Sequence, residues 1–315
     1  MKKSPKLSPD VILKKYWNDN ARFADLFNAY FFHGNEIITA EELTELDTDM
    51  SDTLNHKDFV ETSKAARDII KVAKKSSKSD INFVILGIEN QEYIDYSMPV
   101  RVMNYDSISY KKQLQQIALS NKNNPTLNQN EFLSKFKKTD KLVPVVTIVI
   151  YYGDKPWDGA KSLFEMFNFS DEAIIKLANN YRLNLLEVKN NDFKFHNKYN
   201  IDFFNLMKII LDNSLPKKDA YDKAIKYAEE NKTDNSVILT VAGATNAKIN
   251  YAKMNGGNAM CTLFDEIAAE ASIKTYIQTC REFNVTEEEL IQKLITKFNL
   301  TKEEAKDYII SYLEN

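Results

Sequence analysis

The sequence contains few of the residues that build thiolate metal sites, disulfide frameworks and loop-rich folds. Its 315 residues include 2 Cys, 3 His, 7 Gly and 7 Pro. Cys261 and Cys280 have no ligand-like spacing, and the histidines lie far apart in the sequence. This argues against a zinc site and predicts reduced thiols in a cytoplasmic protein. The scarcity of glycine and proline favours long regular elements.

Long hydrophobic runs are also absent. No window approaches the roughly 18 consecutive apolar residues of a membrane-spanning helix, and the N-terminus, MKKSPKLSPD, has no apolar signal-peptide stretch. We therefore expect no membrane segment. A hydrophobic content of 43%, with 18 Phe and 16 Tyr, suffices for a sizeable core.

An excess of basic charge is missing as well, because the net charge is −3. The distribution is nevertheless uneven. Residues 64–78 contain six basic side chains and a single acid, Asp68, whereas the last 34 residues carry eight acids and four lysines. A basic segment suits nucleic-acid phosphates, and an ordinary solvated face is the alternative.

The hydrophobic pattern predicts an α/β fold. Residues 17–33 have the spacing of an amphipathic helix, and the acidic segment 36–56 is expected to be a connector that contains a helix. Several segments are short and apolar or β-branched, which is typical of strands. They are 58–62, 67–73, 82–90, 142–152 and, as an outer strand, 184–189.

Helices are expected between and after these strands. Ser97 and Pro99 form a helix start, with the hydroxyl as cap, and that helix is predicted to run to Leu119. A short basic helix is predicted at 131–141. The C-terminal sequence FNVTEEE recurs 15 residues later as FNLTKEE, and each copy has the Thr-x-x-Glu pattern of a capping box, which predicts two short helices. We expect a main domain over 1–190, a helical extension over 191–260 and a helical tail over 261–315.

A candidate metal site lies at the end of the predicted strand 82–90. Glu89 and Gln91 are two residues apart, so both side chains project from the same face. A buried carboxylate is costly unless it is paired or bound to a cation. Asp68 lies on the preceding strand-like segment, and if the two strands pair, Asp68 and Glu89 meet. With the backbone carbonyl of Asn90 they offer oxygen ligands for Mg²⁺, or for Mn²⁺ or Ca²⁺.

Such a cation can polarise a phosphate and lower the pKa of an attacking water. Gln91 is then placed to orient that water or to contact the phosphate. A D…ExQ pattern is short, however, and an isolated match commonly has a purely structural origin.

Basic and aromatic residues nearby are candidates for phosphate contacts. Arg101 and Tyr105 are four residues apart on one face of the predicted helix, where the guanidinium can stabilise phosphate charge. The alternatives are an ion pair of Arg101 with Asp106 or a neighbour, and ordinary packing of Tyr105. Lysines near Asp68 are candidates for following a DNA backbone: Lys71, Lys74 and Lys75.

Several motifs, taken in order, resemble the Rpn family of recombination-promoting nucleases, also described as transposases. The motifs that carry the resemblance are IENQ at 88–91, MPVRVMNYDSISY at 98–110 and VTIVIYYGDKPWDG at 146–159. Two more are similar to the Gram-positive branch of that family: NARFADLFNA at 20–29 and GGNAMC at 256–261.

The resemblance implies a PD-(D/E)XK fold, in which a mixed central sheet is flanked by helices, and metal-dependent cleavage of DNA. The family's catalytic aspartate matches Asp68, and its E-x-Q matches Glu89 and Gln91. This sequence departs from the family at RVMNYD, where RNMLYD is usual. Val102 thus replaces an amide, for which Asn104 is a candidate substitute.

The implied function is a DNA endonuclease that promotes recombination or acts against foreign DNA. The alternative is a DNA-binding or self-assembling protein with an idle nuclease core, whose tail forms a homodimer or binds DNA or a protein partner. A transposase of the DDE type is disfavoured, because no third carboxylate is suitably arranged. Asp25 is either a further metal ligand or a surface residue, and Trp157 either a structural plug or a base-stacking platform.

Overall fold

The computed structural model describes residues 9–46, 52–56, 59–63, 68–74, 83–168, 171–175, 177–190, 192–245, 273, 276–281, 285–298 and 300–313. The chain divides into two compact units, of which one is Trp17–Asn200 and the other joins Met1–Tyr16 to Ile201–Asn315. The domain boundaries expected at 190 and 260 stay predictions. None of the helices in the described ranges has the length and apolar character that crossing a membrane requires.

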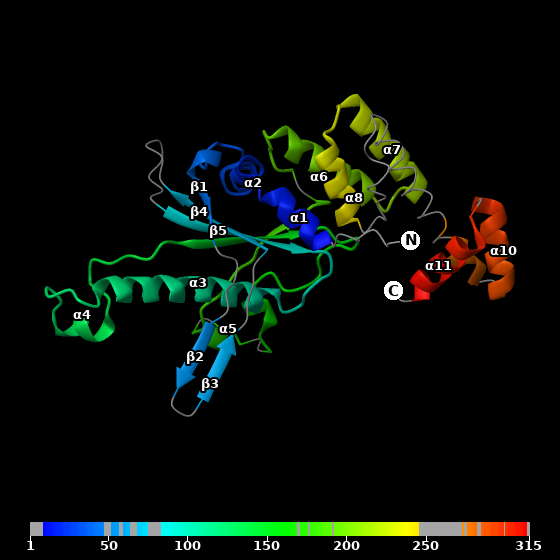
Figure 1. The fold of residues 1–315 in the computed structure, drawn as a ribbon. Coiled ribbons are helices and arrows are strands. Elements are labelled where there is room, and N and C mark those ends of the chain that lie inside the picture. The colour runs from blue at the N-terminus through cyan, green and yellow to red at the C-terminus, as the bar shows by residue number, and fades with distance from the viewer. Residues whose placement is uncertain are drawn as a thin grey trace. The chain divides into compact units, whose positions relative to one another are not determined.

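A mixed five-stranded sheet organises the unit Trp17–Asn200 (Figure 1). In spatial order its strands are β1 (Leu43–Glu45), β4 (Ile69–Lys74), β5 (Phe83–Gln91), β6 (Val145–Tyr151) and β7 (Asn184–Glu187). β1, β4 and β5 pair antiparallel, whereas β5, β6 and β7 pair parallel. A parallel pair needs a crossover, and the one between β5 and β6 contains a long helix, α3 (Met98–Asn121). β2 (Asp52–His56) and β3 (Phe59–Ser63) form a separate antiparallel pair.

Two helices cover opposite faces of this sheet, α3 on one and α2 (Asn20–Phe32) on the other (Figure 1). Tyr105 and Ile108 of α3 pack in one buried cluster with Ile70, Ile85 and Val145. Alternate residues of a strand point to opposite faces, and Lys71 accordingly meets α2 instead. The prediction of an α/β fold with a mixed sheet flanked by helices is confirmed.

The predicted strands at 58–62, 67–73, 82–90, 142–152 and 184–189 correspond to β3, β4, β5, β6 and β7. The expectation for 36–56 is wrong in part. Its helical turn is present as η1 (Ala40–Glu42), but the segment also contains β1 and β2. β1 has only three residues, so its ladder with β4 stabilises it, and its own pattern gives little signal.

Shorter helices complete this unit: α4 (Gln129–Ser134), η2 (Phe164–Met166) and α5 (Glu172–Ile175). The basic helix predicted at 131–141 is shorter than expected. Lys135 has a φ of 58°, in the left-handed region, and α4 therefore ends at Ser134. The predicted helix after Ser97 is confirmed as α3.

The second unit is helical in its described parts, as expected for residues beyond 190. It contains α1 (Pro9–Trp17) up to Tyr16, most of α6 (Lys198–Ile210), α7 (Lys217–Glu230), α8 (Asn235–Ala244), α10 (Glu287–Phe298) and α11 (Lys302–Leu313). Both predicted caps form, since the N–H of Glu289 donates to the Thr286 hydroxyl and that of Glu304 to the Thr301 hydroxyl. The motif GGNAMC at 256–261 lies outside the described residues.

Candidate active site at the end of strand β5

A buried carboxylate, Glu89, lies near the end of the apolar strand β5. Its side chain is 2% exposed, and a charge at that depth needs a cation or hydrogen bonds to offset the loss of water. Its Oε1 accepts a hydrogen bond from Nη2 of Arg101 at 2.5 Å and one from Nε2 of Gln91 at 3.3 Å. The contact with Gln91 fits the expectation that these side chains share a face of the strand.

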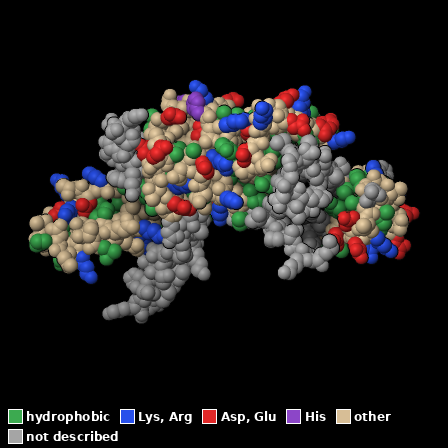
Figure 2. All heavy atoms as spheres, turned by 45° about the horizontal axis from the view of Figure 1, so that its top comes forward, with side chains coloured by type: hydrophobic (Ala, Val, Ile, Leu, Met, Phe, Trp, Pro, Cys, Tyr) green, Lys and Arg blue, Asp and Glu red, His purple; other side chains and the backbone are tan. Residues whose placement is uncertain are grey.

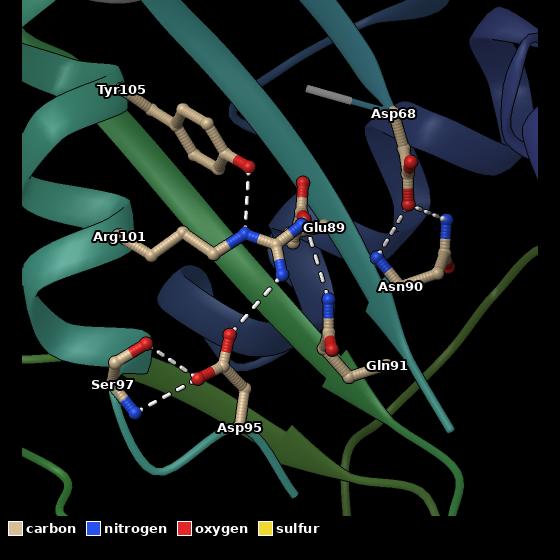
Figure 3. A network of polar contacts seen from close by, with 8 residues as sticks. All are labelled: Asp68, Glu89, Asn90, Gln91, Asp95, Ser97, Arg101 and Tyr105. Carbon is tan, nitrogen blue, oxygen red and sulfur yellow. Dashed lines mark hydrogen bonds and ion pairs between the residues drawn. The ribbon is translucent and has the colours of Figure 1, made fainter. Parts of the chain in front are cut away.

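Arg101 connects the first turns of α3 to the end of β5 (Figure 3). Its guanidinium also donates from Nη1 to Oδ2 of Asp95 at 3.2 Å and from Nε to Oη of Tyr105 at 2.7 Å. Burial by itself lowers the pKa of Arg101, but the Glu89 carboxylate and the bonds to Tyr105 and Asp95 raise it above the ordinary value. The guanidinium is therefore a permanent positive charge in this site.

An ion pair between Arg101 and Asp106, one alternative from the sequence, does not form. Asp106 is buried and accepts hydrogen bonds from Oγ1 of Thr147 at 2.8 Å and from Oη of Tyr181. Residues five apart on a helix point in different directions, whereas those four apart share a face. Asp106 thus fastens α3 to β6 and to the segment before β7.

The turn between β5 and α3 supplies an acid that sequence analysis missed, Asp95. Its Oδ1 accepts from the N–H of Ser97 at 2.8 Å and from the Ser97 hydroxyl at 2.6 Å. Burial raises the pKa of Asp95, but these bonds and Arg101 outweigh it and leave the pKa below its usual value. Ser97 does not cap α3 as predicted, because its hydroxyl donates to Asp95. The Asp-x-Ser spacing of a local turn was the available signal.

Asp68 directly precedes β4 and lies beside the end of β5. Ile69 is opposite Ile88 in the antiparallel pair, so continuing that register places Asp68 opposite Glu89. Oδ2 of Asp68 accepts from the N–H of Asn90 at 2.7 Å and from its Nδ2 at 3.0 Å. Figure 3 shows the two carboxylates at the same end of the strands, each turned toward its own donors.

Both carboxylates, Glu89 and Asp68, affect the pKa of the Tyr105 phenol. Burial raises its pKa, the charges of Glu89 and Asp68 raise it further, and Arg101 lowers it. Its ring also packs in the core beneath α3. Tyr105 is thus a packing residue and a member of the polar network, and its contact with DNA stays a prediction.

Asn90 brings two further oxygens to this strand end. Its N–H points toward Asp68, and the carbonyl of a strand residue lies on the same edge as its N–H. The carbonyl of Gln91, by contrast, accepts from the N–H of Tyr152 on the β6 side. Within the described part of the chain, no donor reaches the buried Oδ1 of Asn90. The atoms that could coordinate a metal ion here are therefore all oxygens, which are the ligands that a hard divalent cation prefers.

Clusters rich in potential metal ligands do not occur elsewhere in the described ranges. No group of three or more His, Cys, Asp or Glu side chains there could hold a metal ion. The site at β5 has two carboxylates, so its remaining ligands would be the Asn90 oxygens and water.

Lys71 does not lie with these residues. Its side chain is 1% exposed, and its Nζ donates to the carbonyl of Asn18 and to Oδ1 of Asn20, both at 2.6 Å, with the ring of Phe23 nearby. Burial lowers its pKa, and the charges of Glu45 and Asp19 partly offset this. Its location gives no support to a phosphate contact. Lys74 ends β4, and its side chain, like all of Lys75, lies outside the described residues.

Two other residues singled out in the sequence, Asp25 and Trp157, are buried and hydrogen-bonded within the protein. Asp25 is buried, and it accepts from the N–H of His196 and from Nδ2 of Asn200, both at 2.8 Å, so it is not a surface residue. Trp157 is also buried, and its Nε1 donates to the carbonyl of Gly159 at 2.8 Å. This position favours a structural plug for Trp157.

The residue at which this sequence departs from the motif RNMLYD, Val102, has apolar surroundings in the structure. Val102 is buried among Met98, Val149 and Trp157. Asn104 is exposed and does not occupy the place of the missing amide. The packing at position 102 therefore needs no polar partner here.

Comparison with known proteins gives one match. A family described as Putative transposase, YhgA-like matches residues 39–235, which is more than half of the chain and spans β1 to α7. Neither a curated protein nor a solved structure matches. The match includes all of the site residues from Asp68 to Asp106. The chain belongs to this YhgA-like putative transposase family.

Proposed function

We propose that this protein is a metal-dependent DNA endonuclease of the PD-(D/E)XK type. Family membership suggests a DNA-related function. The observation that carries the proposal is that Asp68, directly before β4, and Glu89, on the paired strand β5, lie at one end of the sheet, with Arg101 bonded to Glu89. The mixed sheet flanked by helices is the arrangement that the Rpn resemblance implies.

The site fits a divalent cation by the chemistry of its donors. Carboxylate oxygens of Asp68 and Glu89, with an oxygen of Asn90, would hold Mg²⁺, Mn²⁺ or Ca²⁺. The unsatisfied Oδ1 of Asn90 supports this assignment, because a buried oxygen without a donor is costly. When bound, the cation would polarise a scissile phosphate and lower the pKa of a water.

The chain's own polar groups would hold the substrate. The amide of Gln91, beside Glu89, would orient the attacking water or a phosphate oxygen. Arg101 would contact a phosphate through a charge-assisted hydrogen bond, because it is 39% exposed and permanently charged. Tyr105 would hold the guanidinium plane through its bond to Nε.

A plasmid-nicking assay with purified protein tests the proposal. Wild type should relax supercoiled DNA with Mg²⁺, and EDTA should stop it. Asp68→Ala should lose nearly all activity, whereas Asp222→Ala, which removes an exposed carboxylate on α7, should keep it. If Asp68→Ala cuts as fast as wild type, the assignment of the site is wrong.

A second candidate function, self-assembly with an idle nuclease core, rests on the C-terminal helices. α10 and α11 share a buried cluster that includes Ile277, Leu290, Leu294 and Ile309. A small core of this kind indicates a locally packed module, which would form a homodimer or bind DNA or another protein. Light scattering on the full chain and on a 1–260 truncation would separate these functions. An unchanged oligomeric state after truncation counts against the dimer.

A further inference from the structure

The second half of α3 extends beyond the part of the helix that packs on the sheet. Buried residues of α3 lie between Met98 and Ser109, and the next buried position is Asn121 at its end. α4 and a loop then lead back to β6. We name residues 111–141 the α3–α4 arm; in Figure 1 it reaches outward from the sheet with α4 at its far end.

Polar contacts fix the shape of this arm. Nδ2 of the buried Asn121 donates to the carbonyl of Lys135 at 3.1 Å and to Oδ2 of Asp140 at 2.8 Å. At the return to the sheet, Gln113 exchanges two hydrogen bonds with the backbone of Val143. The arm is therefore a preformed element, which binds a rigid partner with a small loss of entropy.

The arm is strongly basic in a chain whose net charge is −3. It has seven lysines and two acids, which gives a net charge of +5. Five of the lysines form no ion pair with any residue of the described ranges: Lys122, Lys135, Lys137, Lys138 and Lys141. Figure 2 shows Lys side chains beside hydrophobic ones on the projection at the left.

Both acids of the arm are engaged by its backbone. Glu131 accepts from the N–H of Asn128 and the N–H of Lys138, and Asp140 accepts from the N–H of Lys137. These bonds, with a smaller contribution from the charge of Lys137, hold the pKa of each carboxyl below its usual value. The acids thus shape the loop, and they do not form ion pairs with the lysine ammonium groups.

We propose that the α3–α4 arm binds the phosphate backbone of duplex DNA at a distance from the cleavage site. The inference rests on the proposed function for the nature of the partner. Duplex DNA carries about one negative charge per 1.7 Å of its axis, which complements a rigid cluster of lysines. The alternative partner is an anionic membrane surface. It would explain the exposed leucines of the arm, such as Leu119 and Leu133.

The length of α3 sets the spacing of the two contacts. Twenty residues separate Arg101 from Asn121, and at about 1.5 Å per residue they span roughly 30 Å. At about 3.4 Å per base pair, this is roughly nine base pairs of duplex. A duplex of that length or less cannot occupy the cleavage site and the arm together.

The experiment is DNA binding by fluorescence anisotropy in EDTA, where cleavage is stopped. The probe is a labelled duplex of about 30 base pairs, measured over a range of salt concentrations. The test variant replaces three exposed or partly exposed lysines of the arm: Lys135→Gln, Lys138→Gln and Lys141→Gln. The matched control makes the same change in three lysines of α7: Lys218→Gln, Lys223→Gln and Lys226→Gln. Circular dichroism melts check that both variants fold.

We expect the arm variant to bind at least about tenfold more weakly at roughly 0.1 M salt. The slope of log K against log salt should fall by up to about 2.7, because each phosphate contact contributes about 0.9. The control should match wild type. A duplex of about eight base pairs should show a smaller difference, since it cannot span both contacts.

Three results would overturn the proposal. The salt slope of DNA binding could be the same in the arm variant as in wild type, or the α7 control could lose as much DNA affinity as the arm variant. The third is an arm variant that loses binding to phosphatidylserine vesicles and not to DNA. The proposed function fails separately. Asp68→Ala should bind the long duplex like wild type and fail to nick plasmid. If Asp68→Ala nicks normally while the arm variant still loses DNA affinity, the nuclease assignment is wrong, and the proposal that the arm binds DNA still holds.

Discussion

Arg101 donates to Oε1 of Glu89 at 2.5 Å, so a fixed positive charge already lies against the carboxylate that would bind the metal. A guanidinium and a divalent cation both neutralise a buried carboxylate, and both need its oxygens. The two should therefore compete. Arg101 would stabilise the metal-free protein and contact phosphate once the cation is bound.

The variant Arg101→Gln tests this competition. Loss of the guanidinium should raise Mn²⁺ affinity, measured by titration calorimetry, by about tenfold, which corresponds to about 1.4 kcal/mol. Without metal the variant should melt earlier than wild type, because Glu89 loses its counter-ion, and Mn²⁺ should restore more stability to it. Nicking should fall. Arg182→Gln, at an exposed position, is the control, and equal Mn²⁺ affinity in all three proteins would rule competition out.

Asp95 should make stability depend on pH in the acidic range. Its pKa is lower in the folded protein than its ordinary value, so its contribution is complete above about pH 4 to 5 and is lost as the pH falls through the folded pKa. Urea unfolding of wild type and Asp95→Asn should differ by about 1 kcal/mol at neutral pH, and the difference should shrink toward pH 3. A difference that stays constant with pH would contradict this role.

Lys71→Met should lower the stability of the protein without changing its binding to DNA. The ammonium satisfies Asn18 and Asn20 in a buried position, and its loss leaves two acceptors unpaired, which costs about 2 kcal/mol or more of unfolding free energy. The salt slope of DNA binding should equal that of wild type, because the side chain does not reach solvent. A reduced slope in a folded Lys71→Met protein would restore the phosphate role predicted from the sequence.

Asn90→Ala should reduce cleavage by loosening Asp68. The side-chain donor to Oδ2 is lost, but the backbone N–H remains, so the effect should be partial. We expect nicking to slow about five- to tenfold, equivalent to about 1 to 1.4 kcal/mol, which is somewhat less than a complete hydrogen bond to a charged group contributes. Metal affinity should fall with it, and a change in neither quantity would exclude the side chain of Asn90 from the site.

The strands that build the site could be predicted because their signal is local. β5 and β6 are nearly continuous apolar runs, and each begins and ends within a few residues of its predicted bounds. β1 could not be predicted, because Leu43–Glu45 is three residues long and forms a strand only through its pairing with β4. A pattern over one segment cannot show a partner elsewhere in the chain.

The site itself was predictable in its centre and not at its margins. Glu89 and Gln91 follow from the alternation of one strand. The role of the Asn90 side chain requires knowing that β4 starts one residue after Asp68, which only the register of two strands shows. Lys71 is a basic residue within a basic run, and only the packing of α2 distinguishes it from an exposed lysine.

The buried ammonium of Lys71 also keeps β4 in register. Lys71 and Asp68 are three residues apart, so they belong to opposite faces of the sheet. A slip of β4 by one residue would move the ammonium from its Asn acceptors into the apolar cluster beneath α3, at a cost of several kcal/mol. The same slip would carry Asp68 away from Asn90. The geometry of the candidate site thus depends on a side chain that lies on the opposite face of the sheet.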